Sequence, residues 1–244
     1  MVCAALLAAA GCDNTPTTPT GGGRTSATQV FSGTIAPGET PSQVFTLPGS
    51  SPLQLMFATL TDSTGFPMST PLTVQFGIVP STGGTCSPLT TATSPPALQA
   101  QISLSASSGA YCVGLANSAA LTATANYSIR ITYGTATSNT DAGTIEYSSS
   151  VEAGGFTARS FEAGAKGVVT ILVDAIAPAS VASLGVGVGL QRNDGSGCDL
   201  SVAGSSTRAS QFSVPVDLGR YCVKVFDQGT LTGTTTFTLR ISHP

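Results

Sequence analysis

The chain carries one unusual stretch twice, and this duplication constrains the fold more than any other feature. Cys112 lies in the sequence GAYCV, and Cys222, 110 residues later, lies in GRYCV. A second cysteine precedes each copy at nearly the same distance, Cys86 before the first and Cys198 before the second. A pattern that recurs in the same order at this separation predicts two tandem copies of one domain.

The composition predicts that both copies are all-β. The 244 residues allow two domains of about 105 residues each. Thr, Ser, Val and Ala are abundant, and 28 Gly and 15 Pro favour short strands joined by many turns. Alternating apolar residues in both halves argue against disorder. We therefore expect two tandem β-sandwich domains of jelly-roll or immunoglobulin-like type, each with one disulfide.

The charge content argues against nucleic acid as a partner. Only 9% of the residues are charged, the formal net charge is −3, and lysine and arginine form no cluster. A protein that holds nucleic acid needs a basic patch to neutralise phosphates. Binding to nucleic acid is therefore not expected.

The N-terminal segment 1–12, MVCAALLAAAGC, is a short apolar run that ends in small residues. A membrane-spanning helix needs about 20 apolar residues, so this run is typical of the end of a secretory signal. Ala9–Cys12 resembles a bacterial lipobox, which implies cleavage and a covalent lipid on Cys12. Residues 13–27 then read as a flexible polar tether rich in Pro and Gly. A buried helix and a signal without lipid are the alternatives.

The remaining chain divides at a small, polar segment. We expect a first domain over 28–134, a linker over 135–141 and a second domain over 142–244. Strict alternation over 72–78 predicts a strand, and 184–190 repeats the pattern 112 residues later.

Two further segments of the first copy have distinct patterns. The alternation of Leu53, Leu55 and Phe57 predicts a strand with one buried face. Residues 80–96, which contain Cys86, read as a turn-rich connection, and 98–104 reads as another alternating segment.

Four cysteines remain once Cys3 is removed with the signal and Cys12 carries lipid. Four cysteines allow three pairings, and the duplication favours the two within the repeats, Cys86 with Cys112 and Cys198 with Cys222. Each bond would stabilise its domain by roughly 3 kcal/mol on the chain-entropy model and would persist in an oxidising compartment. A zinc site made of all four is the alternative, but zinc ligands usually come in close pairs.

The start and end of the first copy resemble a known family. Residues 31–40 (FSGTIAPGET), 43–47 (QVFTL) and 127–131 (YSIRI), together with the Gly-x-Tyr-Cys-Val stretch, are similar to the bacterial pre-peptidase C-terminal domain. The resemblance covers most of both copies and is clearer in the first. It implies small jelly-roll sandwiches of the kind found on secreted proteins.

Some members of that family bind calcium or insoluble polymers through acidic residues, and this chain has no comparable acidic cluster. The nearest candidate joins Asn193 and Asp194 to Asp199. Asn-Asp-Gly sequences favour turns, and the segment lacks the alternating oxygen ligands of an EF-hand loop. We therefore expect a turn here, with a metal site as the alternative.

Catalytic chemistry finds little support. The single histidine, His243, is the penultimate residue, where we expect a mobile tail that does not position an imidazole. The carboxylates are scattered over predicted turns and strand ends, where we expect them to be solvated. Gly185, Gly187 and Gly189 lie on one face of a predicted strand and precede no helix, so they allow close approach of another chain segment. We expect no enzyme and no cofactor besides the lipid.

Two further pairs recur at matching positions. Arg130 and Arg240 are expected to face outward between apolar neighbours. The alternative is that both arginines contact a partner. Tyr111 and Tyr221 are expected to be core or inter-strand residues beside the disulfides, with platforms that stack on a ligand as the alternative.

These observations predict a lipid-anchored protein of the bacterial cell envelope, on its periplasmic or cell-surface side. We expect a non-catalytic scaffold or accessory subunit that binds a protein partner or membrane complex. A carbohydrate- or cell-wall-binding module is the first alternative, although the chain has no Trp and few aromatic residues. A secreted hydrolase is the second, and it would need a pair of carboxyl groups about 5 to 9 Å apart.

Overall fold

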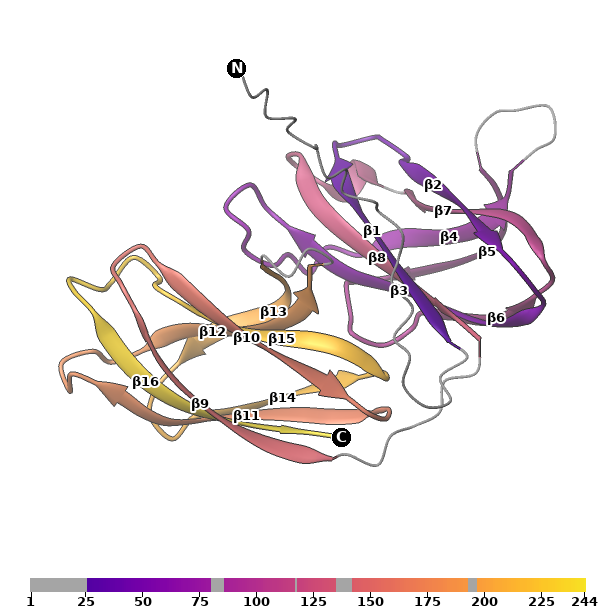
Figure 1. Ribbon diagram of the computed structural model, residues 1–244. Helices are drawn as coiled ribbons and strands as arrows, with labels where there is room; N and C mark the ends of the chain where they lie inside the picture. Colours follow the sequence, from indigo (N-terminus) through magenta and orange to yellow (C-terminus); the bar gives the residue numbers. More distant parts are fainter. Residues whose placement is uncertain (1–25, 80–85, 117, 135–141, 193–196) are drawn as a thin grey trace, which may run out of the picture.

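The computed structural model describes residues 26–79, 86–116, 118–134, 142–192 and 197–244. They form two β-sandwich domains in tandem, each built from two antiparallel four-stranded sheets (Figure 1). Cys12, with nearly all of the predicted tether, and the predicted linker 135–141 lie outside the described residues. In the part that is described, no helix has the length and apolar character needed to cross a membrane.

The first domain contains eight strands and one short 3-10 turn, Ser118–Ala120. The strands are β1 (Ala27–Ile35), β2 (Ser42–Leu47), β3 (Ser51–Thr61), β4 (Leu72–Ile78), β5 (Ser87–Ser94), β6 (Ile102–Ala106), β7 (Gly109–Ala116) and β8 (Ala125–Tyr133). One sheet has the order β1-β8-β3-β6, and the facing sheet has the order β2-β7-β4-β5.

The second domain repeats this arrangement strand for strand. Its strands are β9 (Gly143–Val151), β10 (Phe156–Ala163), β11 (Gly167–Ala177), β12 (Leu184–Gln191), β13 (Cys198–Ser206), β14 (Gln211–Val216), β15 (Gly219–Phe226) and β16 (Thr235–His243). The sheet orders β9-β16-β11-β14 and β10-β15-β12-β13 are those of the first domain with each number raised by eight. Eight strands in two facing four-stranded sheets with crossing connections form a jelly roll.

The first turn of each domain is a corner between its two sheets. Gly38 and Gly154 occupy the equivalent turn positions with φ of +84° and +71°, a conformation that glycine adopts without steric cost. The turn Ala36–Glu39 is closed by the Glu39 amide, which donates to the Ala36 carbonyl at 3.1 Å. β1 and β2 flank this turn but pair with β8 and β7, so they do not form a hairpin.

The prediction for residues 80–96 is wrong in one respect, because β5 lies inside the expected connection. β5 is an edge strand with the sequence SPLTTATS, most of which is exposed, so it lacks the apolar alternation that reveals a strand. Hydroxyl groups tie it to its neighbour instead, as in the 2.8 Å hydrogen bond between Thr73 and Thr93.

The two disulfides are those that the duplication predicts, Cys86–Cys112 and Cys198–Cys222. In the second domain the bond passes across β12, which lies between β15 and β13 in the sheet. Gly189 of β12 stands opposite Cys222 at a bulge, and a Cβ on Gly189 would overlap the carbonyl oxygen of Asp199. The close packing of these three strands therefore requires glycine at this position.

Each sandwich encloses its own apolar core. The first core includes Phe57, Phe76 and Ile129, and the second includes Val188 and Ile241, all buried. The second core also extends into the first domain, because three side chains of that domain pack against it: Met56, Ala58 and Leu98. The two domains are thus joined by continuous apolar packing.

Candidate functional site

The junction between the domains begins at β3. Its inward residues face the first core as the alternation predicts, but Met56 and Ala58 on its other face are also buried, at 2% and 0% exposure. That face packs against β12 and β13 of the second domain. The prediction of a single buried face is therefore wrong, since a second domain covers the face that the pattern assigns to solvent.

Arg130 of β8 lies at the centre of this junction, only 4% exposed, so the expectation that it faces outward is wrong. Its Nη2 donates to the Tyr221 hydroxyl at 2.8 Å and to the Leu218 carbonyl at 3.3 Å. The guanidinium carbon also lies 5.0 Å from the centre of the Tyr221 ring. Gly219, with φ of +151°, leaves the space for this group, because a Cβ there would lie 2.5 Å from Nη1. Arg130 thus contacts the second domain of its own chain.

Asp217 completes the polar part of the junction and is 5% exposed, contrary to the expectation that the carboxylates are solvated. Its Oδ2 accepts a hydrogen bond from the Ala100 amide at 2.7 Å, and its own amide donates to the Leu98 carbonyl at 2.9 Å. Lys166 lies 3.6 Å from Oδ1. The carboxylate therefore has partners in both domains, as a buried charge requires.

Tyr221 links Arg130 to this network. Burial raises the pKa of its hydroxyl above the ordinary tyrosine value, an effect that Arg130 opposes. The protonated hydroxyl donates to the Asp217 carbonyl at 2.7 Å. Tyr111 makes the equivalent bond to the Ser107 carbonyl at 3.0 Å. In each domain the tyrosine hydroxyl therefore bonds the backbone four residues before it. Tyr221 is fully buried, and Tyr111 is half-buried and packs against the first core, so both agree with the predicted core or inter-strand position.

The repeated arginine of the second domain has a different environment. Arg240 of β16 forms an ion pair with Asp174 at 3.1 Å on an exposed face. Asp174 occupies the position that Ala58 holds in the first domain, so one copy places a carboxylate where the other places a methyl group. The two arginines therefore share a strand position but do not share a role.

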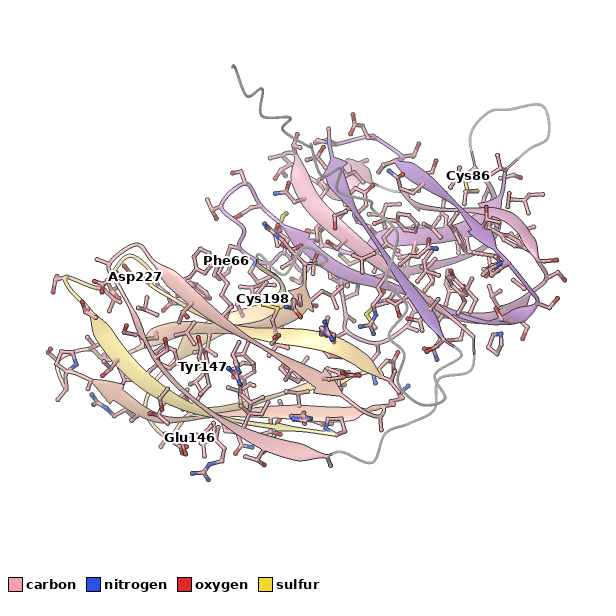
Figure 2. The ribbon with its side chains drawn as sticks, viewed as in Figure 1. Phe66, Cys86, Glu146, Tyr147, Cys198 and Asp227 are labelled. Atoms are coloured by element: carbon pink, nitrogen blue, oxygen red, sulfur yellow. A yellow bond between two sulfur atoms is a disulfide. The ribbon has the colours of Figure 1, made fainter. Side chains whose placement is uncertain are left out.

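A cleft of about 380 Å³ opens between the domains beside this junction. The first domain contributes the loop after β3. The second domain contributes the turn before β10, the outer face of the β10-β15-β12-β13 sheet and the end of β15. The lining residues are Thr64–Phe66, Gly154–Phe156, Leu200, Lys224 and Phe226–Gln228. Figure 2 shows Phe66 at the boundary between the two domains. Phe66 meets Phe226 edge to face, with 6.3 Å between ring centres.

Two of the cleft aromatics remain open to solvent. Phe66 is 44% exposed and Phe156 is 58% exposed, although both belong to a residue class that is usually buried. The ammonium of Lys224 lies 4.2 Å from the centre of the Phe156 ring. An aromatic surface beside a cation is the kind of arrangement that recognises a ligand with both apolar and charged parts.

Lys224 has no ion pair within the described part of the chain. Its pKa is lowered from the ordinary lysine value, chiefly because burial disfavours the charge and secondly because Arg192 is near, while Asp199 opposes the shift. Arg192 and Asp199 are bonded to each other at 2.8 Å. Lys224 therefore presents a positive charge to the cleft that no described carboxylate pairs.

Two carboxylates hold the loops of the cleft in place, Asp227 in the lining and Asp62 at the start of the loop that supplies Thr64 and Phe66. Asp227 accepts backbone hydrogen bonds from three following residues through Oδ1, at 2.9 to 3.1 Å, and from Gly154 through Oδ2 at 2.8 Å. Asp62 likewise accepts from the amides of Thr64 and Phe66. These bonds lower the pKa of both carboxyl groups, led by the Gly154 amide at Asp227 and by the Thr64 hydroxyl at Asp62. They fix the segments that carry Phe66 and Phe156.

The glycines of β12 permit close approach, as the sequence predicts, and the approaching groups come from the same domain. The Phe226 ring lies over Gly185, and the Val202 carbonyl would be 2.7 Å from a Cβ on Gly187. Because β12 presents no side chains here, Phe226 lies flat enough to form a wall of the cleft.

The remaining predicted sites take no part in the cleft's lining. Asn193 and Asp194 lie outside the described residues, and Asp199 pairs with Arg192. No group of three or more metal-binding side chains occurs within the described ranges. His243 is not on a frayed tail: it is the last residue of β16, paired with Gly143, and its ring stacks on Phe161.

A second hollow, of about 420 Å³, lies on the outer face of the β11–β16–β9 sheet. Small side chains line it, mainly of Ser148, Ser150, Ala175 and Thr236, and no charged group is among them. We therefore regard the interdomain cleft as the better candidate site.

Comparisons with known proteins add little to this geometry. No protein-family model matches the chain, and no curated protein matches it in sequence. A chain of the Sulfolobus turreted icosahedral virus is similar at 13% identity and a TM-score of 0.29, over 91% of this chain and 93% of that one. A fucolectin from striped bass (Morone saxatilis) serum is similar at 10% identity and a TM-score of 0.27, over 87% of this chain and 85% of that one.

The isomalto-dextranase of Arthrobacter globiformis T6 is similar at 11% identity and a TM-score of 0.28, over 87% of this chain but 34% of that one. At such TM-scores, these likenesses carry no argument about ligand or activity. The assignment as two jelly-roll sandwiches rests on the strand order of the chain itself.

Sequence reasoning misses the residues of the cleft. Phe66 follows a turn, Phe156 begins a strand and Lys224 lies between two valines of a later strand, so no periodic pattern connects them. The repeat offers one signal, because Phe226 and Lys224 occupy the positions of Ala116 and Gly114 in the first copy. Large and charged groups that replace small ones in one copy mark where the copies differ in role.

Proposed function

We propose that the chain is a non-catalytic binding subunit of the bacterial envelope, held to a membrane by lipid on Cys12 and rigid enough to present one surface to a protein partner. The lipobox-like end of segment 1–12 and the polar tether support the anchor. The two disulfides support an oxidising compartment outside the cytoplasm. Kinship with the pre-peptidase C-terminal domain belongs to the same proposal and rests on the sequence resemblance.

The observation that carries the proposal is the buried junction at Arg130. A pair of domains joined only by a flexible linker would change the shape of the cleft continually. Here apolar packing and the bonds of Arg130 and Asp217 hold the two walls of the cleft together. A preformed binding surface loses less entropy on association, so it favours stable contact with a partner.

The chemistry of the cleft favours binding over hydrolysis. Asp62 and Asp227 have their oxygens engaged by backbone amides, which lowers their pKa, whereas a general acid needs a raised pKa. Their arrangement serves loop geometry.

The test is site-specific crosslinking in the native envelope. A photoreactive residue replaces Phe156 at the cleft in one variant and Val44, an exposed residue of β2 that does not line the cleft, in the matched control. We expect one defined protein adduct from position 156 and none from position 44. The absence of an adduct from position 156 in intact cells would refute the binding role. Cys12→Ser should move the protein from the membrane fraction to the soluble fraction.

A carbohydrate-binding module is the second candidate, favoured by the exposed rings of Phe66 and Phe156. Aromatic faces at the edge of a cleft can stack on sugars. Pull-down with peptidoglycan and a panel of glycans tests it, with Phe156→Ala as the variant that should lose retention.

A further inference from the structure

The cleft offers one unpaired positive charge beside aromatic and aliphatic side chains. Lys224 has no ion pair among the described residues, and its ammonium packs against the Phe156 ring. Phe66, Phe226 and Leu200 supply the rest of the apolar wall. A ligand that satisfies both features must carry one anionic group within a few ångströms of an apolar side chain.

We propose that the cleft binds a peptide segment of the partner in which a carboxylate stands next to an aromatic or large aliphatic side chain. The carboxylate pairs with Lys224, and the apolar side chain lies between Phe66 and Phe156. This inference rests on the proposed role as a subunit that binds a protein, and it specifies what that partner presents.

The complementarity of charge supports an acidic segment. Asp227 in the lining and Asp62 in the adjoining loop accept hydrogen bonds from backbone amides, and neither forms an ion pair with Lys224. Arg192 adds a positive field near Lys224, although its bond to Asp199 reduces the effect. Burial removes part of the hydration of the Lys224 ammonium, and a carboxylate that enters the cleft would replace it with an ion pair.

Few polar side chains of the cleft lining remain free to bond the hydroxyls of a sugar, which favours a peptide over a glycan. A sugar carries many hydroxyls, and each needs a partner when it leaves water. The cleft lining supplies the Gln228 amide, but the Thr64 hydroxyl already donates to Asp62 at 2.6 Å. One cation between aromatic rings suits one carboxylate and one apolar side chain better than a polyhydroxylated ring.

The test measures binding of small probes to the whole chain by the chemical shifts of its backbone amides. N-acetylphenylalanine carries the carboxylate and the ring, its amide derivative carries the ring alone, and glucuronic acid carries a carboxylate on a sugar. We expect N-acetylphenylalanine to shift the amides of 64–66, 154–156 and 224–228. The amide derivative should bind about tenfold to a hundredfold more weakly, because it lacks a charge-assisted hydrogen bond.

Matched variants show whether Lys224 is responsible. Lys224→Met should remove the preference for the acid over the amide derivative, and Lys224→Arg should retain it. Arg220→Met is the control, because Arg220 lies on the same strand and face of β15 but outside the cleft lining. The unchanged spectrum elsewhere in each variant establishes that it is folded.

Four results would overturn the proposal. They are equal binding of the acid and its amide derivative, stronger binding of glucuronic acid, absence of shifts in the cleft, and shifts of the cleft amides on dilution, which would indicate a second copy of the chain. The outcome separates from that of the proposed function. If the probes bind but no partner is crosslinked, the proposed ligand site stands and the proposed function is refuted. If Lys224→Met captures the partner as well as the wild type does, the proposed function stands and the proposed ligand site is refuted.

Discussion

Replacing Arg130 by methionine should weaken the junction between the domains far more than the same change at Arg240. Methionine keeps most of the aliphatic stem but removes the charge. Two hydrogen bonds from a charged donor contribute roughly 1.5 to 3 kcal/mol each, and a desolvated contact with an aromatic ring contributes about 2 kcal/mol. The cost of keeping a guanidinium out of water offsets several kcal/mol of this sum. We expect a net loss of about 3 kcal/mol for Arg130→Met.

Arg240→Met is the matched control, since Arg240 has the equivalent strand position and a half-exposed ion pair with Asp174. Exposed pairs of this kind contribute about 0.5 kcal/mol. The assay is chemical denaturation followed by circular dichroism. Arg130→Met should lower the unfolding midpoint and separate the transitions of the two domains, and Arg240→Met should leave a single, nearly unchanged transition. Equal effects of the two substitutions would refute the role given to Arg130.

Three further predictions concern the framework of the second domain and its cleft. Replacing both Cys198 and Cys222 by alanine should lower the free energy of unfolding by roughly 3 kcal/mol, measured by denaturation against the wild type under oxidising conditions. Gly189→Ala should destabilise by about 3 kcal/mol or more because its Cβ meets backbone, whereas Gly204→Ala, with nothing within 4 Å, should change stability by less than about 0.5 kcal/mol. Because the folded-state pKa of Asp227 is lowered, its stabilising effect is present above the ordinary aspartate pKa of about 3.9 and is lost as pH falls through the lower value. The protection of the 229–231 amides, measured as the exchange rate relative to that of an unstructured peptide at the same pH, should therefore stay high at pH 5 and fall only below pH 4. A loss of protection already at pH 5 would contradict the assignment.

The duplication predicts much of the fold because the features that it repeats are local properties of the sequence. The alternation over 72–78, the turn glycine at Gly38 and the position of Cys112 each depend on strand period or on backbone conformation. Their repetition in the second half confirms the pattern without knowledge of the contacts. The same reasoning misses β5, because an edge strand that is mostly exposed needs no apolar alternation.

The junction and the cleft depend on contacts between the copies, which no local pattern contains. Arg130 and Arg240 look equivalent in the sequence, and only the packing of a second domain over β3 and β8 distinguishes them. Asp217 likewise resembles a surface acid until Ala100 and Lys166 are placed beside it. Differences between the two copies, such as Ala58 against Asp174, are the signal that comes closest to revealing the interface.

Whether the cleft is a preformed site depends on the relative orientation of the two domains in solution. Residual dipolar couplings of backbone amides report whether both jelly rolls tumble as one body. We expect the couplings from the described residues of the two domains to fit one alignment tensor, and those of Arg130→Met to require two. If the wild-type couplings themselves require two tensors of different magnitude, the domains move independently and the cleft is not a preformed site.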